Sequence, residues 1–332
     1  MKKLNNFLLY SNIYKDEALC VANEVKSRIT IKGGEACICS KDDILAASKE
    51  NGFDLDKVDC IIVLGGDGTL IRACHTIGER FIPMIGVNLG TVGFLTEVDL
   101  PKIDEMITRL MNGDYSIEKR MMLEGMVRLK KVNRGLKDLV HDDVDNVDRE
   151  TFNDLADVDK EVTCDGELEA LSNEKADSAS SFRFNSLNDV VLARSGALRL
   201  IAIKIYVNDK FFDTYEADGV IVSTPTGSTG YNMSAGGPII SPKASLILVT
   251  PICPHSLSKK SVVFSAEDEI KLELIEKRKT QINEALVSFD GFMDYEIGVN
   301  SSVTVRRSEQ ELDLIKLDEE SFYEVLSRKF TV

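Results

Sequence analysis

The sequence predicts an α/β N-terminal domain, with a parallel sheet and flanking helices, followed by a β-rich C-terminal domain. Its 332 residues are enough for two domains of ordinary size, each with its own core. Strand and helix signals alternate up to about residue 115, whereas after residue 118 the apolar segments are short, β-branched and closely spaced. The first pattern favours a parallel sheet wrapped by helices, and the second favours antiparallel β structure.

The helices and strands of the first part are predicted from the spacing of apolar residues. In Glu17–Ile29, residues Ala18, Val21, Val25 and Ile29 fall on one helical face. Short apolar runs bounded by turn residues predict strands. The remaining expected elements are the strands Phe7–Tyr10, Glu35–Ser40, Ile61–Leu64 and Met84–Asn88, and the helix Pro101–Met111.

The second part is predicted to consist almost entirely of strands. We expect an α/β domain over residues 1–118, a β-rich domain over 119–306, and a C-terminal segment, 307–332, that packs back on the first domain. Within this segment Ser321–Phe330 has the apolar spacing of a short helix. The expected strands are Glu124–Leu129, Leu187–Ala193, Ile201–Val207, Gly219–Ser223, Leu246–Thr250, Ser261–Phe264, Ile270–Ile275, Glu284–Phe289 and Ser302–Arg306.

An acidic insertion interrupts the second part at about residues 133–183. Acidic residues greatly outnumber basic ones there, and its end is rich in Ser and Ala. Such a composition buries too little apolar surface to offset the entropy lost on ordering, so we expect an exposed, disordered insertion. A calcium-binding loop is the alternative, but the spacing of the acidic residues fits no such loop.

Composition excludes several classes of protein. The net charge of −15 argues against nucleic acid or an anionic membrane as the main partner. No apolar run approaches the roughly 20 residues that a membrane span needs, and the N-terminus lacks the pattern of a signal peptide. The seven cysteines form neither a CxxC pair nor a zinc signature. We therefore expect a cytoplasmic protein whose cysteines, Cys37 and Cys39 included, are reduced and buried.

The most informative stretch is CIIVLGGDGT, residues 60–69. An apolar strand leads into glycines around one aspartate, and a helix signal follows. Backbone N–H groups at such a turn attract phosphate, so Gly65, Gly66, Gly68 and Thr69 form a candidate phosphate loop. A carboxylate repels an anion, which suggests that Asp67 takes up a proton or meets a metal-bound phosphate. The alternative is a tight glycine turn capped by this aspartate.

Two further clusters precede or begin apolar segments. NLGTVGFLTE, residues 88–97, contains Gly90 and Gly93 but lacks the full dinucleotide fingerprint, so a turn that leads from strand to helix beside the first loop is at least as well supported. Asn88, at the carboxyl end of a strand, could face a ligand. Asn188 and Asp189 begin the run LNDVVLAR, where two buried polar side chains need partners. They either hold a ligand or cap a turn.

A long segment rich in Ser, Thr and Gly spans Glu216–Pro242, EADGVIVSTPTGSTGYNMSAGGPIISP. Small residues allow a ligand to approach backbone amides closely. Flexible linkers have similar composition, but linkers do not interleave Pro225, Tyr231 and Pro238 between strands. No hydrolase triad and no G-x-x-x-x-G-K-[ST] loop is present, so a nucleotide would be bound by another design.

Taken in order, GGDGT, NLGTVGFL, LNDVVL and DGVIVSTPTGSTGY with SAGGPI resemble the NAD kinase family over most of the chain except the acidic insertion. The segment Thr250–Leu257 is similar to bacterial members. GGDGT alone is shared with diacylglycerol and sphingosine kinases. The resemblance implies the NAD kinase/diacylglycerol kinase-like fold and transfer of a phosphoryl group to the 2′-hydroxyl of the adenosine ribose of NAD, giving NADP.

The resemblance also implies the role of individual residues. Asp67 would accept the proton of the ribose hydroxyl, and Gly68 would contact substrate beside it. Asn188 and Asp189 match the Asn-acid pair that holds NAD. The remaining implied NAD-binding residues are Arg72, Arg199, Asp218, Thr229, Gly230, Tyr231, Asn232, Met233 and Ser234.

Cofactors and assembly follow from the same resemblance. ATP or inorganic polyphosphate is the expected phosphoryl donor, together with a divalent metal ion, Mg²⁺, and the sequence separates neither the two donors nor NAD from NADH. No protein side chain is assigned to the metal. A homodimer or homotetramer is expected. Two positions depart from the family, Gly230 where alanine is common and Phe292 where many members have glutamine, which leaves the contact around Asp290 open.

Two other functions compete with this one. A lipid kinase of the diacylglycerol class uses the same glycine loop, but the charge of −15 and the polar run Thr229–Ser234 count against it. A non-catalytic NAD(P)-binding sensor is the second, and the presence of Asp67, Asn188 and Asp189 argues against it. Formation of NADP from NAD and ATP separates all three.

Overall fold

A computed structural model describes residues 1–11, 16, 19–39, 44, 48, 53–77, 80–90, 93–129, 181–196, 200–256, 258–276, 284–317 and 322–330. The predicted acidic insertion lies outside these residues, except for its end. Residues 181–183 belong to a strand, β7 (Ser181–Ser186), which pairs with β6 (Ser116–Arg128).

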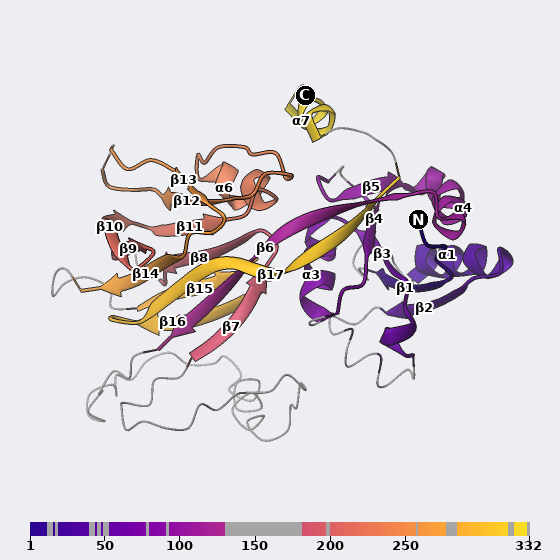
Figure 1. Cartoon of the computed structure of the whole chain (residues 1–332), viewed down its shortest axis with the longest axis horizontal. Coiled ribbons are helices and arrows are strands. Elements are labelled where there is room, and N and C mark those ends of the chain that lie inside the picture. The colour runs from indigo at the N-terminus through magenta and orange to yellow at the C-terminus, as the bar shows by residue number, and fades with distance from the viewer. Residues whose placement is uncertain are drawn as a thin grey trace, which may run out of the picture. The chain divides into compact units, whose positions relative to one another are not determined.

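The N-terminal part is the predicted parallel sheet with helices (Figure 1). Its strands are β1 (Asn6–Ser11), β2 (Glu35–Cys39), β3 (Cys60–Gly65) and β4 (Met84–Asn88), in the order β4-β3-β1-β2. A short strand, β5 (Thr96–Asp99), pairs with β4. The helices are α1 (Cys20–Ile31), α3 (Asp67–Thr76) and α4 (Ile103–Asn112), with 3-10 turns at η2 (Leu55–Lys57) and η3 (Leu100–Lys102). β3 is buried along its whole length, as its unbroken apolar run predicts.

The cysteine prediction is wrong in part. Cys39 is buried, but Cys37 is exposed, as are Cys20 and Cys253. Cys37 lies on β2, which is the edge strand of the sheet, so less of its surface is covered. None of the six cysteines in the described ranges forms a disulfide.

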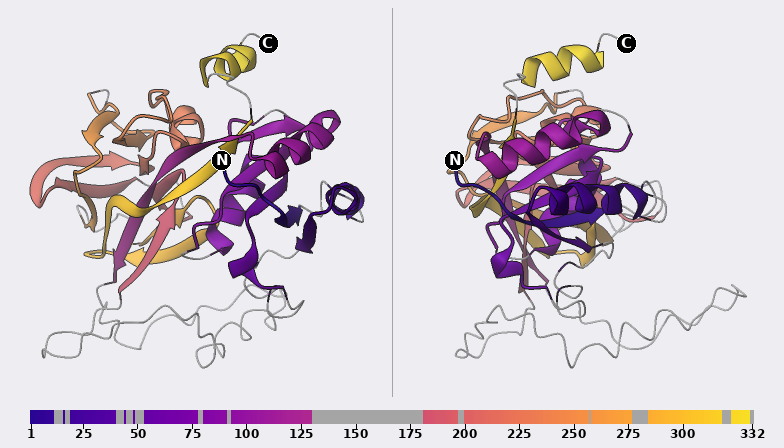
Figure 2. Two further views of the ribbon diagram at one scale, coloured as in Figure 1. Left: turned by 45° about the vertical axis from the view of Figure 1, so that its right-hand side comes forward. Right: turned by 90° about the vertical axis from the view of Figure 1, so that its right-hand side faces the viewer.

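The C-terminal part is β-rich, as predicted. A 6-stranded antiparallel sheet has the order β13-β12-β11-β8-β15-β16. The other strands continue the first sheet, which therefore runs through both parts in the order β10-β9-β14-β17-β4-β3-β1-β2 (Figures 1 and 2). Their bounds are β8 (Asp189–Arg194), β9 (Ile201–Val207), β10 (Lys210–Ala217), β11 (Gly219–Ser223), β12 (Leu246–Ile252), β13 (Val262–Ser265), β14 (Ile270–Ile275), β15 (Glu284–Phe289), β16 (Met293–Gly298) and β17 (Ser302–Lys316).

A core lies between the two sheets of this part. Alternate residues on facing strands, such as Val190, Leu192, Ile203 and Val303, are fully buried in it. Removing such apolar surface from water is the main stabilising contribution, at roughly 25 cal/mol per Å². Tyr215 is almost fully buried in the same core.

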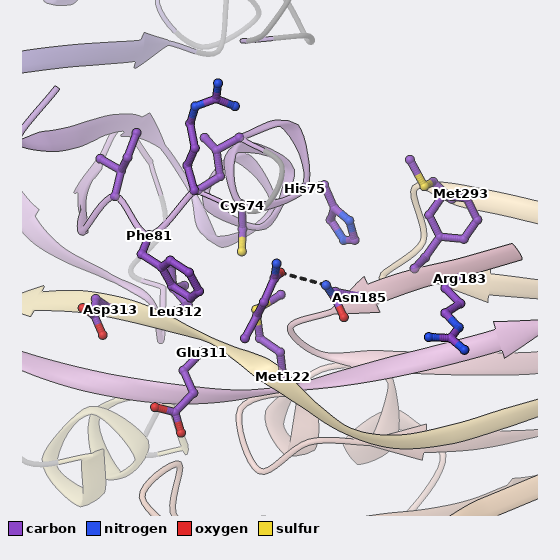
Figure 3. Close-up of a pocket in the computed structure, with 15 residues that line it drawn as sticks. Cys74, His75, Phe81, Met122, Arg183, Asn185, Met293, Glu311, Leu312 and Asp313 are labelled. Atoms are coloured by element: carbon purple, nitrogen blue, oxygen red, sulfur yellow. Dashed lines mark hydrogen bonds between the residues drawn. The ribbon is translucent and has the colours of Figure 1, made fainter. Parts of the chain in front are cut away.

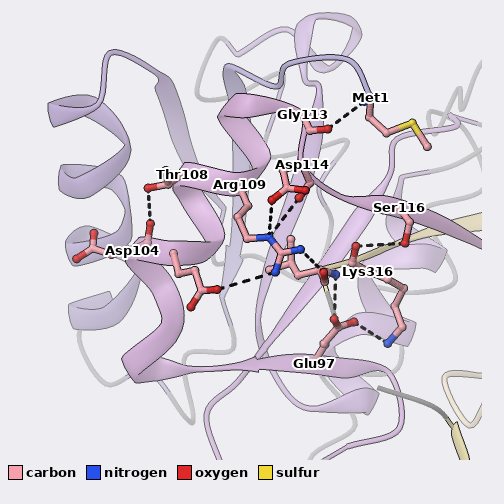
Figure 4. A network of polar contacts seen from close by, with 11 residues as sticks. Met1, Glu97, Asp104, Thr108, Arg109, Gly113, Asp114, Ser116 and Lys316 are labelled. Atoms are coloured by element: carbon pink, nitrogen blue, oxygen red, sulfur yellow. Dashed lines mark hydrogen bonds and ion pairs between the residues drawn. The ribbon is translucent and has the colours of Figure 1, made fainter. Parts of the chain in front are cut away.

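β17 and β6 connect the two parts. β17 pairs with β6 over most of its length, with a bulge between Arg307 and Glu311, and then reaches β4 through Leu314. At the end of β17, Lys316 Nζ lies 2.6 Å from Glu97 Oε2, and the Leu317 N–H donates to Glu97 Oε1 at 2.9 Å (Figure 4). Arg109 of α4 donates to the Leu317 carbonyl. These contacts fasten the returning strand to the first part.

Replacing Glu97 by alanine is expected to destabilise the protein. The Glu97 side chain is only 7% exposed, so its loss leaves the Lys316 ammonium half-buried without its carboxylate. Breaking a buried pair in this way costs about 3 kcal/mol. Urea unfolding measures the cost, and an unchanged midpoint would show that β17 is held by strand pairing alone.

The C-terminal segment ends in α7 (Phe322–Phe330). The ring of Phe322 lies 6.0 Å from that of Phe94, and Lys329 Nζ lies 4.0 Å from the centre of the same ring. None of the helices in the described part of the chain is long and apolar enough to cross a bilayer.

Candidate active site

The glycine turn places Asp67 at the head of a helix. β3 ends at Gly65, Gly66 caps α3, and Asp67 is the first helical residue. The N–H groups of Asp67 and Gly68 have no partner within the helix and carry its positive partial charge. Of the candidate phosphate loop, Gly66 and Gly68 reach the surface, whereas Gly65 and Thr69 are buried against each other. An anion bound at this turn would therefore contact the part of the loop around Gly66 and Gly68.

The Asp67 carboxylate is held in a cradle of backbone amides. Its Oδ2 accepts from the Phe94 N–H at 2.7 Å, and its Oδ1 accepts from those of Leu95 and Thr96 at 3.0 and 3.2 Å. A carboxylate has about four acceptor positions, so Oδ2 keeps one for another donor. Phe94, Leu95 and Thr96 thus lie beside the first loop, as expected, and their amides fix the direction of the Asp67 side chain. The expectation that the turn leads into a helix is wrong, because the chain enters strand β5 at Thr96 and pairs with β4.

Gly93 allows this approach. A Cβ built on Gly93 would lie 1.9 Å from Asp67 Oδ1 and 2.5 Å from Thr96 Oγ1, so any side chain there displaces the carboxylate. Asn88, at the end of β4, hydrogen-bonds through its own side chain to the backbone of Gly90. Asn88 therefore shapes this turn.

Asn188 lies in the turn between β7 and β8, and Asp189 is the first residue of β8. The backbone carbonyl of Asn188 accepts from the Thr224 N–H at 2.8 Å, and Gly227 packs against the same residue, since a Cβ there would lie 2.2 Å from that oxygen. The Asn188 amide nitrogen lies 3.6 Å from the position of a Cβ on Gly230. The pair therefore faces the Ser/Thr/Gly-rich segment. An alanine Cβ at residue 230 would be in ordinary contact with Asn188 but tight against the Gly227 carbonyl oxygen, at 3.3 Å.

Asp189 is an acid with a perturbed titration. Burial first, and then the charge of Asp290, raise the pKa of the Asp189 carboxyl from 3.8 to about 7. Its carboxylate accepts no hydrogen bond from any residue within the described ranges. Burial raises the pKa of the Tyr231 hydroxyl, and the charges of Cys253, Asp189 and Asp218 raise it further. Tyr231 therefore lies near the Asp189 carboxyl.

The Ser/Thr/Gly-rich segment forms a turn, a 3-10 helix and a short helix after β11. These are η4 (Gly227–Thr229) and α6 (Tyr231–Ser234). Thr229, Gly230, Tyr231, Met233 and Ser234 all reach the surface. Asn232 does not, since it is fully buried. Its side-chain amide donates to the carbonyl oxygens of Ser228 and Pro238, and its Oδ1 accepts from the Thr250 hydroxyl. Five of the six predicted residues in this segment are therefore accessible to solvent, whereas the sixth, Asn232, is internal and its hydrogen bonds stabilise the segment.

The charged residues predicted around this site have varied surroundings. Asp218 forms an ion pair with Arg194, whose Nε lies 2.8 Å from Asp218 Oδ1. The guanidinium of Arg72 lies 5.0 Å from the centre of the Phe292 ring, so it faces the turn between β15 and β16. Arg199 lies outside the described residues.

Three residues that the sequence did not single out as ligands of this site take part in it. Asp290 accepts hydrogen bonds from the amides around Asn188, and His75 of α3 contacts Asp290. Arg120 is 4% exposed, pairs with Glu118 at 2.5 Å and donates to Thr226 Oγ1 at 3.4 Å. Burial lowers the pKa of the Arg120 guanidinium, while the charges of Glu118 and Asp67 act to raise it. For Arg120, the available signal in the sequence was a single arginine directly before the apolar run Met121–Leu123.

A cleft of about 200 Å³ lies apart from Asp67, between the C-terminal half of α3 and strands β6, β7, β16 and β17 (Figure 3). His75, Met122 and Met293 are among its lining residues, and none of the predicted ligand residues is. No group of three or more metal-ligating side chains occurs among the residues for which the structure gives a placement.

Comparisons with known proteins agree with the four motifs. The ATP-NAD kinase N-terminal domain model matches residues 5–115, and the ATP-NAD kinase C-terminal domain model matches residues 187–317. NAD kinase of Lachnoclostridium phytofermentans is 34% identical over 328 residues, covering 98% of this chain and 99% of that protein. NAD kinase of Lachnospira eligens is 35% identical over 337 residues, covering 97% and 99%.

Solved structures have the same fold. Yeast NADH kinase complexed with NADH superposes with a TM-score of 0.76 at 20% identity, covering 100% of this chain and 88% of that one. An NAD kinase from Archaeoglobus fulgidus in complex with ATP superposes with a TM-score of 0.65 at 19% identity, covering 98% of each chain. The two domain models and the identity over nearly the whole length show that the chain belongs to the NAD kinase family.

Proposed function

We propose that this phosphotransferase moves the γ-phosphoryl group of ATP to the 2′-hydroxyl of the adenosine ribose of NAD, with Asp67 as the general base. The single observation that carries the proposal is the position of the Asp67 carboxylate. It lies at the start of α3, beside the amides of the glycine turn, and is held by three further backbone amides, those of Phe94, Leu95 and Thr96. A base and an anion-binding turn adjoin each other there, as the reaction requires.

The proposed step moves one proton and one phosphoryl group. The ribose 2′-oxygen gives its proton to Asp67 as it bonds to the γ-phosphorus, and the bond from that phosphorus to the bridging oxygen of ADP breaks. A ribose hydroxyl is a poor nucleophile at neutral pH, so a carboxylate within hydrogen-bond reach contributes typically 10²–10⁴-fold. Because the amides of Phe94, Leu95 and Thr96 fix the carboxylate, the unused acceptor position of Oδ2 has a set direction before substrate binds.

The residues present suit a metal ion carried by the nucleotide. Magnesium is commonly bound through one or two carboxylates together with substrate phosphates and water, and Asp67 is the single carboxylate of the glycine turn. Asp67 would therefore lie next to the ion, which neutralises phosphate charge when bound. The protein itself supplies the amides and the base.

Asn188 and Asp189 are proposed to hold NAD with the surface of the segment after β11. Asn188 faces Gly230, and the charges of Asp189 and Asp218 both reach Tyr231, which indicates that these groups border one space. Thr229, Gly230, Met233 and Ser234 are proposed to line it. Gly68 is proposed to contact substrate beside Asp67.

Gly93→Ala tests whether the cradle sets the reaction rate. The added methyl would overlap Asp67 Oδ1, so the carboxylate must turn away from its amides. We expect kcat for NADP formation to fall roughly 100-fold, because a displacement of about 1 Å costs that much. NADP is measured enzymatically after a fixed time, with the melting temperature as the folding control. Unchanged kcat would remove the cradle from the mechanism.

An assay of NADP formation tests the function. Purified protein is incubated with Mg²⁺ and NAD, and ATP and polyphosphate are supplied in separate reactions. We expect NADP to accumulate with ATP, while the same assay with polyphosphate, and with NADH in place of NAD, defines the donor and acceptor range. Phosphorylation of a diacylglycerol without NADP formation would favour the lipid kinase, and NAD binding without turnover would favour the sensor.

Assembly and location are also proposed. The six free cysteines within the described ranges suit a reducing compartment, so we place the protein in the cytoplasm. A homodimer or homotetramer is proposed from the family, and light scattering of the purified protein measures it.

A further inference from the structure

The Asp290 carboxylate organises the turn that carries Asn188 and Asp189. Asp290 lies between β15 and β16 with a φ of 52°, and its side chain has no exposed surface. Its Oδ2 accepts from the Leu187 N–H at 2.7 Å, and its Oδ1 accepts from the Asn188 and Asp189 N–H groups, both at 2.8 Å. Three successive amides are thereby turned toward one carboxylate.

The fourth contact of this carboxylate comes from the helix that starts at Asp67. His75 Nε2 lies 2.8 Å from Asp290 Oδ2, and the His75 side chain is 10% exposed. Figure 3 shows His75 on α3, directed away from the helix axis toward the strands. Asp67 and His75 are eight positions apart, which corresponds to roughly 12 Å along a helix. One rigid helix therefore connects the Asp67 cradle to Asp290.

A second contact strengthens the same connection. Arg72 lies one helical turn before His75 on the same face, with its guanidinium 5.0 Å from the centre of the Phe292 ring. The His75 ring packs edge-on against Phe292 at 5.9 Å. Phe292 stands where many family members have glutamine, so in this chain the contact to α3 is aromatic.

The energetic argument concerns the oxygen Oδ2 of Asp290. A buried carboxylate is tolerated only when donors satisfy it, and each missing donor leaves a desolvated acceptor. Without His75, Oδ2 keeps only the Leu187 amide, and α3 loses its polar contact with the turn. The turn can then shift relative to α3 while the amides that hold Asp67 stay intact.

We propose that His75 and Asp290 form a positioning pair that sets the Asn188–Asp189 turn relative to Asp67, and so aligns the ribose hydroxyl with the base. The proposal rests on the proposed function. Neither residue touches the reacting atoms; His75 acts through Asp290, and Asp290 acts through the three amides. The expected consequence is a loss in kcat with little loss in NAD affinity, because alignment is disturbed more than binding.

Three substitutions of His75 test the pair. The amide nitrogen of Gln reaches about as far as Nε2 of His, whereas that of Asn stops one bond earlier. We expect His75→Ala and His75→Asn to lower kcat at least about 10-fold, with the calorimetric Kd for NAD within threefold, and His75→Gln to recover kcat to within threefold. Thr76→Ala is the matched control, since the Thr76 hydroxyl donates only to carbonyls of its own helix.

Hydrogen exchange provides a measure that does not depend on activity. In His75→Asn and Asp290→Asn the amides of Leu187, Asn188 and Asp189 are expected to exchange at least about 10-fold faster than in the parent protein, while those of Phe94 to Thr96 stay protected. Unchanged kcat in His75→Ala, equal kcat in the Asn and Gln variants, or unchanged exchange at the three amides would each overturn the proposal. A parent protein that forms no NADP would instead refute the proposed function and leave the exchange result to stand by itself.

Discussion

Asp67→Asn is expected to abolish NADP formation while leaving NAD binding largely intact. Asparagine keeps an oxygen for the amides of Leu95 and Thr96, so the cradle survives in part, but its amide cannot accept the ribose proton. Loss of general-base catalysis alone costs about 10²–10⁴-fold. The rate of NADP formation with saturating ATP measures the first effect, and calorimetry with NAD measures the second.

Two controls separate this chemistry from damage to the fold. The melting temperature of the variant should lie near that of the parent, because Asp67 is only half-buried. Asp59→Asn, which removes a carboxylate paired with Lys2 in the same part of the chain, should leave the rate of NADP formation unchanged. Undiminished turnover in Asp67→Asn would remove Asp67 from its proposed role.

Stability is expected to fall as the pH rises from about 4 to about 7, because of Asp189. Its pKa is about 7 in the folded protein and near 3.8 in the unfolded chain. Between these values the unfolded chain has lost a proton that the folded protein still holds, so rising pH favours unfolding. The full difference corresponds to about 4 kcal/mol, reached above pH 7. Asp290 and Tyr231 are the titratable groups that face it.

Asp189→Asn reveals this contribution. An amide in place of the acid has no proton to lose, so the variant should unfold at a higher urea concentration than the parent at pH 8 and at a similar one at pH 4. The free energy of unfolding, measured at several pH values, gives the slope directly. A parent and a variant with parallel pH profiles would show that the Asp189 carboxyl titrates normally.

Local sequence was enough to predict the elements that present Asp67. The unbroken apolar run before Gly65, the glycines around Asp67 and the helical spacing after it correspond to β3, the cap and α3. Each of these features depends on neighbours within a few residues. The turn with Gly93 was also expected to lie beside this loop, and the amides that follow it donate to Asp67. It was expected to lead into a helix but leads into strand β5, whose pairing with β4 is not visible in the local sequence.

Long-range contacts were not predictable in the same way. The buried polar pair Asn188 and Asp189 indicated that partners were needed, but nothing nearby in sequence points to Asp290, about a hundred residues away. Asn232 resembles its exposed neighbours in sequence, but its side chain is internal because it hydrogen-bonds Ser228, Pro238 and Thr250. β17 was expected to end at Arg306 and continues to Lys316, because β6 and β4 supply pairing partners that a polar stretch does not reveal by itself.

A crystal structure of the protein with NAD and a non-hydrolysable ATP analogue tests the central claim most directly. We predict that Asp67 Oδ2 lies about 2.6–3.2 Å from the 2′-oxygen of the adenosine ribose, with the γ-phosphorus in line on the other side of that oxygen. A 2′-hydroxyl that donates to another residue, with Asp67 still bound only by Phe94, Leu95 and Thr96, would contradict it.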